Sequence, residues 1–108
     1  MATRTSSTVT LQGRSGAKYQ FEAFDWGTEF KPRGAVYAVL RLDPDEYAVL
    51  YIGQTGDLSE RFDDHHKAGC FASHRKTHIG IHLKAVERER LVIEQDLIAF
   101  YYPPCNGS

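Results

Sequence analysis

The sequence predicts one α/β (α+β) domain with a small, mainly antiparallel central sheet of about three strands, flanked by helices and preceded by an extra N-terminal hairpin. The chain has 108 residues, which is the size of one ordinary domain with one core. Two near-continuous apolar runs, 35–40 and 47–52, lie at its centre and predict buried strands. An alternating run and a helical pattern follow them, so strands and helices are mixed along the chain.

Residues 1–33 are expected to form an extension within the same domain as a core at 34–108. Two strand-like runs, 9–11 and 17–24, flank a Gly-rich turn at 13–16, and this pattern predicts a hairpin. We expect the hairpin to extend the sheet; contact with a substrate and a dimer edge are the alternatives.

The middle of the chain alternates loops with structured elements. Segment 25–33 is rich in aromatic residues and is predicted to be a loop that covers one edge of the core. The turn sequence 43–46 joins the two buried strands as an antiparallel pair. Asp57, with Glu60 three residues later, forms a capping-box pattern, which predicts a helix from about residue 57 to 67.

The last third of the chain is predicted to contain a strand and a helix. Segment 68–76 shows no periodicity, whereas 77–83 alternates, with its isoleucines on one face, and predicts a third core strand. A helical stripe follows over 86–101, and the Pro-Pro pair at 103–104 ends it.

Composition excludes several classes of protein. Thirteen Lys and Arg against fourteen Asp and Glu give a net charge of −1, which argues against tight autonomous binding of duplex nucleic acid. No run approaches the ~20 apolar residues of a membrane helix, and the start of the chain lacks the apolar centre of a signal peptide, so we expect a cytoplasmic protein. Cys70 and Cys105 have no partner at two-residue spacing and are predicted to be free thiols.

Glu94 interrupts the apolar stripe of the predicted C-terminal helix. Leu91, Leu97 and Ile98 lie three residues before, three after and four after it, which places its carboxylate on the apolar face. A carboxylate in such a place needs a partner. That partner is either a divalent cation or an arginine, Arg61 or Arg90, in a structural ion pair.

The predicted helix at 57–67 contains a similar exception. Leu58, Arg61, Phe62 and His65 share one face by three- and four-residue spacing, so an arginine and a histidine are expected to point inward together. A lone arginine on such a stripe would instead extend to the surface, but Glu94 provides a matching inward charge.

Several motifs occur in a characteristic order between residues 34 and 106. They are Val36-Tyr37, Tyr51-Ile52-Gly53, Arg61, His65, Glu94 with Leu97-Ile98, and Asn106. This ordered set resembles the motifs of the GIY-YIG nuclease family, and the whole set at plausible spacing is more specific than any one of its elements. The first motif departs from the family pattern, because Ala35 replaces its Gly and Val36 its Ile; the tyrosine that follows is retained.

The resemblance implies hydrolysis of phosphodiester bonds with one divalent cation, Mg²⁺ or Mn²⁺. Glu94 would hold the metal ion, which would coordinate the scissile phosphate. Arg61 would donate hydrogen bonds to the non-bridging oxygens and compensate the charge that grows in the transition state.

The resemblance also implies roles for the remaining motif residues. Tyr37 would position or deprotonate the attacking water, and Tyr51 would hydrogen-bond the phosphate or the nucleophile. His65 would orient a tyrosine or act as the base itself, so the identity of the base stays open. Gly53, the last residue of the second motif, would have a supporting role, and Asn106 would anchor the C-terminal segment against the site.

A local basic segment near these motifs is a candidate for binding nucleic acid. Its residues are Lys67, His74, Arg75 and Lys76. Such a segment can give a modest phosphate-facing patch or a solvated loop. A zinc site is disfavoured, because no pair of standard ligand spacing was found among His66, His74, His78, His82 and Cys70.

These observations favour a small metal-dependent endonuclease that acts on DNA in preference to RNA. The alternative is a noncatalytic module that binds nucleic acid or protein and keeps the fold for its shape. A third possibility, an ordinary domain with a structural ion pair, does not explain the strand and turn motifs. Because the chain is not basic, a partner protein or a homodimer is expected to supply substrate affinity.

Overall fold

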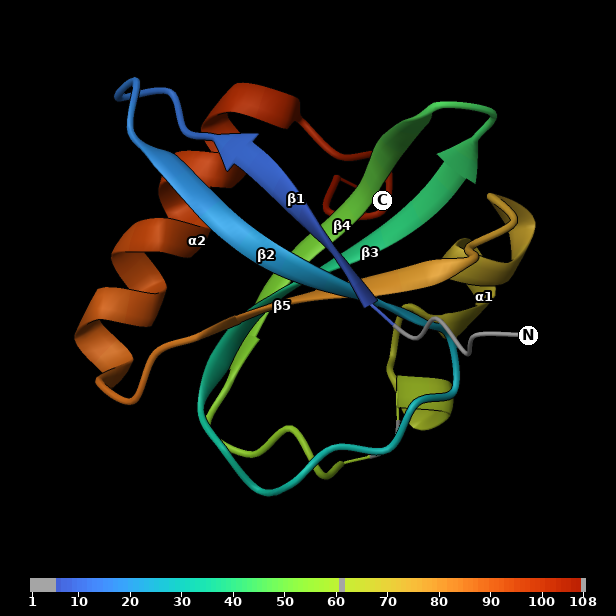
Figure 1. Cartoon of the computed structure of the whole chain (residues 1–108), viewed down its shortest axis with the longest axis horizontal. Coiled ribbons are helices and arrows are strands. Elements are labelled where there is room, and N and C mark those ends of the chain that lie inside the picture. Colours follow the sequence, from blue (N-terminus) through green and yellow to red (C-terminus); the bar gives the residue numbers. More distant parts are fainter. Residues whose placement is uncertain (1–5, 61, 108) are drawn as a thin grey trace.

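The computed structural model describes residues 6–60 and 62–107 and contains a mixed set of strands and helices (Figure 1). The elements in chain order are β1 (Ser6–Gln12), β2 (Lys18–Asp25), β3 (Ala35–Asp43), β4 (Glu46–Thr55), a short 3-10 helix η1 (Phe62–Asp64), α1 (Ala68–Ser73), β5 (His78–Leu83) and α2 (Glu87–Tyr101). The predicted combination of an antiparallel sheet with helices is confirmed.

The sheet has five strands in the order β1-β2-β5-β3-β4, and every neighbouring pair is antiparallel. The prediction of about three strands was therefore too low. The N-terminal hairpin joins the central strands, because β2 pairs with β5 from Glu22 opposite Ile81 to Asp25 opposite His78. Without β2, this edge of β5 would leave its backbone N–H and C=O groups unpaired.

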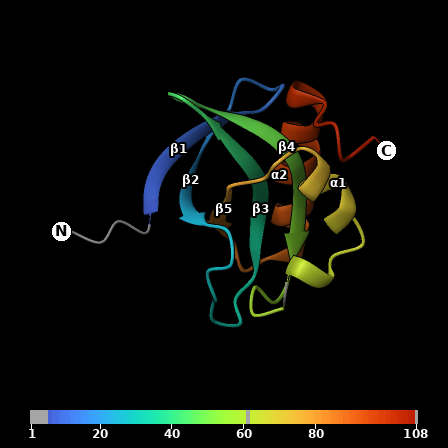
Figure 2. The same ribbon diagram turned by 90° about the vertical axis from the view of Figure 1, so that its right-hand side faces the viewer.

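Two apolar clusters cover the opposite faces of the sheet. On one face α2 packs Ile93 and Leu97 against sheet residues that include Val36 and Ile52. On the other face the side chain of Phe71 from α1 packs among residues that include Tyr37. Figure 2 shows α1 and α2 on different sides of the sheet near β4, which is an edge strand.

The predicted helix at 57–67 is wrong. The chain instead forms a turn after Asp57, the 3-10 helix, and then α1, which falls in the segment predicted to be irregular. The side chain of His65 explains part of this difference. Its Nδ1 accepts a hydrogen bond from the Lys67 N–H at 3.0 Å, so that N–H is not available to continue an α-helix.

The stripe that helix α2 packs on the sheet overlaps the predicted one in part. Leu97 is buried and Ile98 and Tyr101 pack against the core as predicted, but Arg90 and Ile93 are buried too, whereas Leu91 is exposed. The helix ends as predicted before the Pro-Pro pair, and Tyr102 follows it in the left-handed conformation, with a φ of 46°. No helix among the described residues is long and apolar enough to cross a membrane.

The prediction of two free thiols is also wrong. Cys70 in α1 and Cys105 in the C-terminal segment form a disulfide, with their Cα atoms 5.9 Å apart. Because 35 residues separate them in sequence, only the fold brings the two sulfurs within bonding distance. The bond ties α1 to the C-terminal segment.

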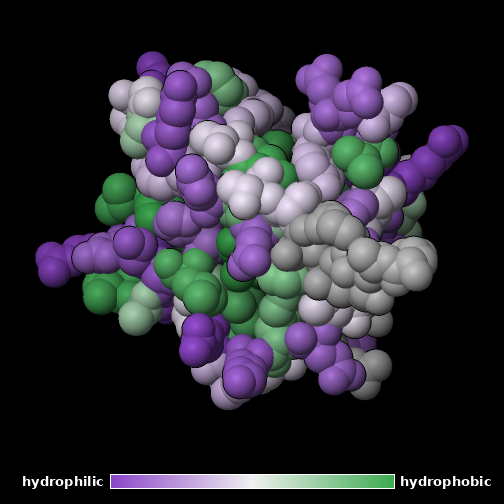
Figure 3. All heavy atoms as spheres, viewed as in Figure 1, coloured by the Kyte–Doolittle hydropathy of each residue, from purple (hydrophilic) through white to green (hydrophobic). Residues whose placement is uncertain are grey.

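The outer surface is mostly hydrophilic in the view of Figure 3, with apolar side chains gathered toward its lower centre. The exposed apolar residues of α2 include Leu91 and Val92, of which Val92 is 63 % exposed. Leu91 and Val92 line a groove together with Tyr19 of β2 and with Arg14 and Ser15 of the turn before it.

Candidate functional site

Tyr37 and Tyr51 lie side by side on the face of the sheet that α1 covers. Tyr37 is opposite Gly53 in the β3–β4 pairing, and Tyr51 is two residues earlier on β4. The centroids of the two tyrosine rings are 6.1 Å apart. A Cβ atom on Gly53 would come within 2.6 Å of the Tyr37 hydroxyl and 2.9 Å of the Tyr51 ring, so the glycine makes room for both tyrosines.

His65 joins this pair from the segment after η1. Its Nε2 lies 2.8 Å from the Tyr37 hydroxyl oxygen, and its ring centroid is 5.1 Å from that of Tyr51. Burial lowers the pKa of His65, and the neighbouring His66 and Lys67 lower it further, so the neutral ring is favoured.

The hydrogen bonds of His65 fix the tautomer of the neutral ring. The Lys67 backbone N–H can only donate, so Nδ1 must accept. The ring proton is therefore on Nε2, which donates to the Tyr37 hydroxyl oxygen. In this arrangement His65 cannot also accept a proton at Nε2.

Glu94 contributes a carboxylate from α2, the helix that packs on the other face of the sheet. Its side chain is half-buried, and this burial raises its pKa. Its negative charge is near enough to both tyrosines to be among the causes that raise the pKa of each, although burial is the largest cause for both. Glu94 takes part in none of the ion pairs formed by the described residues.

A pocket of about 550 Å³ opens beside Tyr37 and His65. Its other lining residues are Thr55, Asp57, Glu60, Phe62, Asp64 and His66. Three of these carry carboxylates, so the pocket repels a phosphate unless cations are bound nearby. The predicted phosphate-binding residue, Arg61, lies outside the described residues.

Arg90 does not pair with Glu94, although the sequence allowed that pair. It is only 6 % exposed, and its guanidinium donates to Gln54 Oε1 at 2.8 Å, Ala85 O at 2.7 Å and Lys84 O at 3.1 Å. Its partners are all uncharged oxygens. Arg90 therefore holds the end of β4 against the loop before α2 and leaves Glu94 free of that partner.

Asn106 binds the outer edge of β4 next to Tyr51. Its Oδ1 accepts from the Ile52 N–H, and its Nδ2 donates to the Ile52 carbonyl oxygen, both at 2.9 Å. The adjacent Cys105 N–H donates to the Leu50 carbonyl oxygen at 2.9 Å. These bonds provide partners for backbone N–H and C=O groups on the outer edge of β4, which has no neighbouring strand on that side.

The residues of the predicted basic segment do not point to one common surface feature. His74 Nδ1 lies 3.0 Å from the Cys70 carbonyl oxygen, beside the disulfide. The ammonium group of Lys76 lies 5.3 Å from the centroid of the Trp26 ring, in a cation–π contact. Arg75 is exposed and has a φ of 61°, and Lys67 is half-buried.

Two features of this region were missed by sequence reasoning. The bond from Arg90 to Gln54 gives no local signal, because the two residues lie 36 positions apart in sequence. The cluster of His74 with both cysteines does give a local signal in the sequence, because Cys70 and His74 are four residues apart and would share one face of a helix.

Comparison of the chain with family models, with curated proteins and with solved structures gives no match.

Proposed function

We propose that this protein is a metal-dependent endonuclease of the GIY-YIG type that hydrolyses phosphodiester bonds of nucleic acid, DNA in preference to RNA. The observation that carries the proposal is the meeting of Tyr37, Tyr51 and His65 from three separate segments of the chain, with the half-buried carboxylate of Glu94 near enough to raise the pKa of both tyrosines. Perturbed titratable groups gathered in this way are typical of a functional site.

In this proposal Tyr37 is the general base and His65 is its positioning residue. Tyr37 lines the pocket, and His65 Nε2–H donates to its hydroxyl oxygen, which favours the phenolate over the phenol. Burial, Tyr51 and Glu94 act in the opposite direction and raise the pKa of Tyr37. Neutralising the charge of Glu94 would remove one of these opposing causes.

Glu94 is the residue that would hold the divalent cation, Mg²⁺ or Mn²⁺. Its half-buried carboxylate lacks an ion-pair partner among the described residues, which suits a hard cation that keeps several water molecules. The bound cation would supply Lewis-acid stabilisation of the phosphate oxygens. Arg61 would donate hydrogen bonds to the same oxygens.

The charge of the chain favours weak, salt-sensitive binding of substrate. The net charge is −1, and three acidic residues line the pocket beside Tyr37. We therefore propose that a protein partner or a second copy supplies affinity, and that the protein acts in the cytoplasm.

The second candidate is a noncatalytic module that binds nucleic acid or protein. The acidic lining of the pocket favours the protein-binding form of this module, because an unassisted site of this charge repels phosphate. The two candidates differ in one measurable property: only the enzyme cleaves nucleic acid, and this cleavage requires the carboxylate of Glu94.

The test is cleavage of labelled duplex, single-stranded, flap and branched DNA and of RNA at low salt, with Mg²⁺ or Mn²⁺ against EDTA. We expect metal-dependent cutting that is lost in Glu94→Gln, Arg61→Ala and Tyr37→Phe. The matched controls are Glu87→Gln, an exposed carboxylate on the same helix, and Tyr102→Phe, an exposed tyrosine. Both controls should cut like the wild type; cutting that survives Glu94→Gln would refute the assigned site.

The role of His65 is tested by the dependence of rate on pH. His65→Ala removes a hydrogen bond to the Tyr37 oxygen, so the pH at which the rate is half-maximal should move upward with Tyr37 still required. If His65 were the base, its removal would instead abolish the pH dependence near neutrality.

A further inference from the structure

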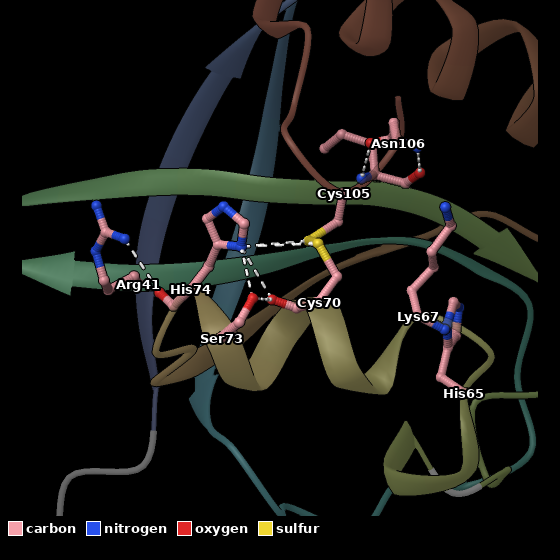
Figure 4. The surroundings of a disulfide bond; sticks show 9 residues. Arg41, His65, Lys67, Cys70, Ser73, His74, Cys105 and Asn106 are labelled. Carbon is pink, nitrogen blue, oxygen red and sulfur yellow. Dashed lines mark hydrogen bonds between the residues drawn. A yellow bond between two sulfur atoms is a disulfide. The ribbon is translucent and has the colours of Figure 1, made fainter. Parts of the chain in front are cut away.

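Three potential metal ligands meet outside the proposed nuclease site (Figure 4). Cys70 lies in α1, His74 follows the end of that helix, and Cys105 comes from the C-terminal segment. Their sulfur and ring nitrogen atoms all lie within 4.8 Å of one another. Across the part of the chain that the structure describes, this is the one such group of three.

The distances within this group are close to those around a tetrahedral zinc ion. His74 Nδ1 lies 3.7 Å from Cys70 Sγ and 3.9 Å from Cys105 Sγ. Bonds of ~2.3 Å to sulfur and ~2.0–2.1 Å to nitrogen place a sulfur and a nitrogen ligand about 3.6 Å apart, and two sulfurs about 3.8 Å apart. Only the separation of the two sulfurs must change, because they are bonded to each other.

We propose that reduction of the Cys70–Cys105 disulfide converts this group into a binding site for Zn²⁺. The ligands are Cys70 Sγ, Cys105 Sγ and His74 Nδ1, with a water molecule as the fourth. The same sulfur atoms form the disulfide, so the disulfide and the metal exclude each other. This site is independent of the proposed nuclease function.

The chemistry of the three ligands selects the metal. Thiolate and imidazole ligands suit zinc and other soft or borderline ions, whereas Mg²⁺ requires oxygen ligands. Two thiolates balance the charge of Zn²⁺, so the site adds no net charge to a region where Cys105 is fully buried. Cys70 and His74 are half-buried, which leaves a route to solvent.

The ligands are held near one another by bonds other than the disulfide. Cys105 is fixed to β4 through its own N–H and through Asn106. The His74 carbonyl oxygen accepts from Arg41 Nη1 at 3.1 Å, and the His74 N–H donates to the Cys70 carbonyl oxygen at 3.1 Å. Opening the disulfide therefore leaves the three side chains close together.

The conversion balances in atoms and charge. A phosphine reductant breaks the sulfur–sulfur bond, takes the oxygen of a water molecule and leaves two thiols. Zn²⁺ then displaces the two thiol protons to solvent. His74 Nδ1 lies 3.0 Å from the Cys70 carbonyl oxygen and 3.3 Å from Ser73 Oγ. To bind the metal, the imidazole of His74 must transfer its proton from Nδ1 to Nε2 through solvent. Nδ1 then binds the metal in place of its hydrogen bond to the Cys70 carbonyl oxygen.

The test uses the full chain, reduced with the phosphine and then freed of it without air. Zn²⁺ is titrated against a chromogenic chelator, and Co²⁺ is added as a spectroscopic probe. We expect one equivalent of metal, thiolate-to-cobalt charge-transfer bands, and no binding by the oxidised protein. Absence of those bands, or equal binding by the oxidised protein, would overturn the proposal.

Variants separate the three ligands from general metal binding. Groups that merely orient a ligand cost about 10–100-fold in metal affinity when mutated, so His74→Ala should weaken binding at least that much. His78→Ala, a histidine outside the group, should leave it unchanged. Circular dichroism of the reduced variants is the control that they are folded. Equal affinity of His74→Ala and the wild type would exclude the histidine as a ligand and overturn the three-ligand site.

Discussion

Reducing the Cys70–Cys105 disulfide should lower the free energy of unfolding of the protein by about 4 kcal/mol. The bond closes a loop of 35 residues. In the chain-entropy relation, a loop of this size removes roughly 13 cal/mol/K from the unfolded state, which is about 4 kcal/mol at 298 K. Whole domains are stable by only about 5–15 kcal/mol, so the loss is a large part of the total.

The assay is unfolding in urea, with and without the phosphine reductant, in EDTA so that no metal binds. Trp26 is the sole tryptophan and packs against Phe71 of α1, with ring centroids 5.9 Å apart, so its fluorescence follows this region. The dependence of unfolding free energy on urea should also steepen, because the reduced unfolded chain exposes more surface.

The control is the double variant Cys70→Ser/Cys105→Ser, on which the reductant should have no effect. A change smaller than about 1 kcal/mol, with both thiols shown by titration to be free, would refute the reasoning that the bond constrains the unfolded chain. When the EDTA is replaced by Zn²⁺, a higher free energy of unfolding for the reduced wild type but not for the double variant would support the metal site.

Three further predictions follow from the candidate site and its surroundings. Gly53→Ala must displace the Tyr37 ring, so it should lower the free energy of unfolding in urea by about 1–3 kcal/mol and also lower cleavage. The control Gly69→Ala, in helix α1 with no atom near the added Cβ, should raise the free energy of unfolding by about 0.5–1 kcal/mol. Equal effects of the two substitutions would contradict the steric explanation. Arg90→Met leaves the oxygen acceptors of Gln54, Lys84 and Ala85, which are half-buried or exposed residues, without their donor. It should cost about 1–3 kcal/mol, measured by urea unfolding; a neutral result would show that water replaces the guanidinium. Burial raises the pKa of Glu94 above the 4.5 of an ordinary glutamate. Without metal, the native state therefore binds more protons than the unfolded state, and the contribution of Glu94 to stability falls as the pH rises above 4.5. Glu94→Gln should therefore be more stable than the wild type at pH 7 in EDTA and equal to it at pH 3, and Mg²⁺ should stabilise only the wild type; a Mg²⁺ effect on both proteins would locate the ion elsewhere.

The strands were predictable because their signals are local. The apolar runs now in β3 and β4, the turn between them and the alternation in β5 each occupy a few consecutive residues. The end of α2 was predictable for the same reason, since a Pro-Pro pair cannot continue a helix.

The segment around His65 was not predictable from its capping pattern. Asp57 does accept a hydrogen bond from the Ser59 N–H at 2.8 Å, as a capping residue would. The side chain of His65 then takes the Lys67 N–H, and the helix begins only at Ala68. This side-chain bond accounts for the local structure just before α1, and the composition of the segment does not show it.

The sequence by itself determined the mixed fold class, the antiparallel central strands and the presence of two tyrosines, a histidine and a misplaced carboxylate. Their residue types and spacings are properties of the chain. The tertiary structure decided which groups meet: His65 with Tyr37, Arg90 with neutral oxygens, and Cys70 with Cys105. The contacts of His65 with Tyr37, of Arg90 with Gln54 and of Cys70 with Cys105 join residues 28 to 36 positions apart, where only the packing of the sheet and helices sets the distance.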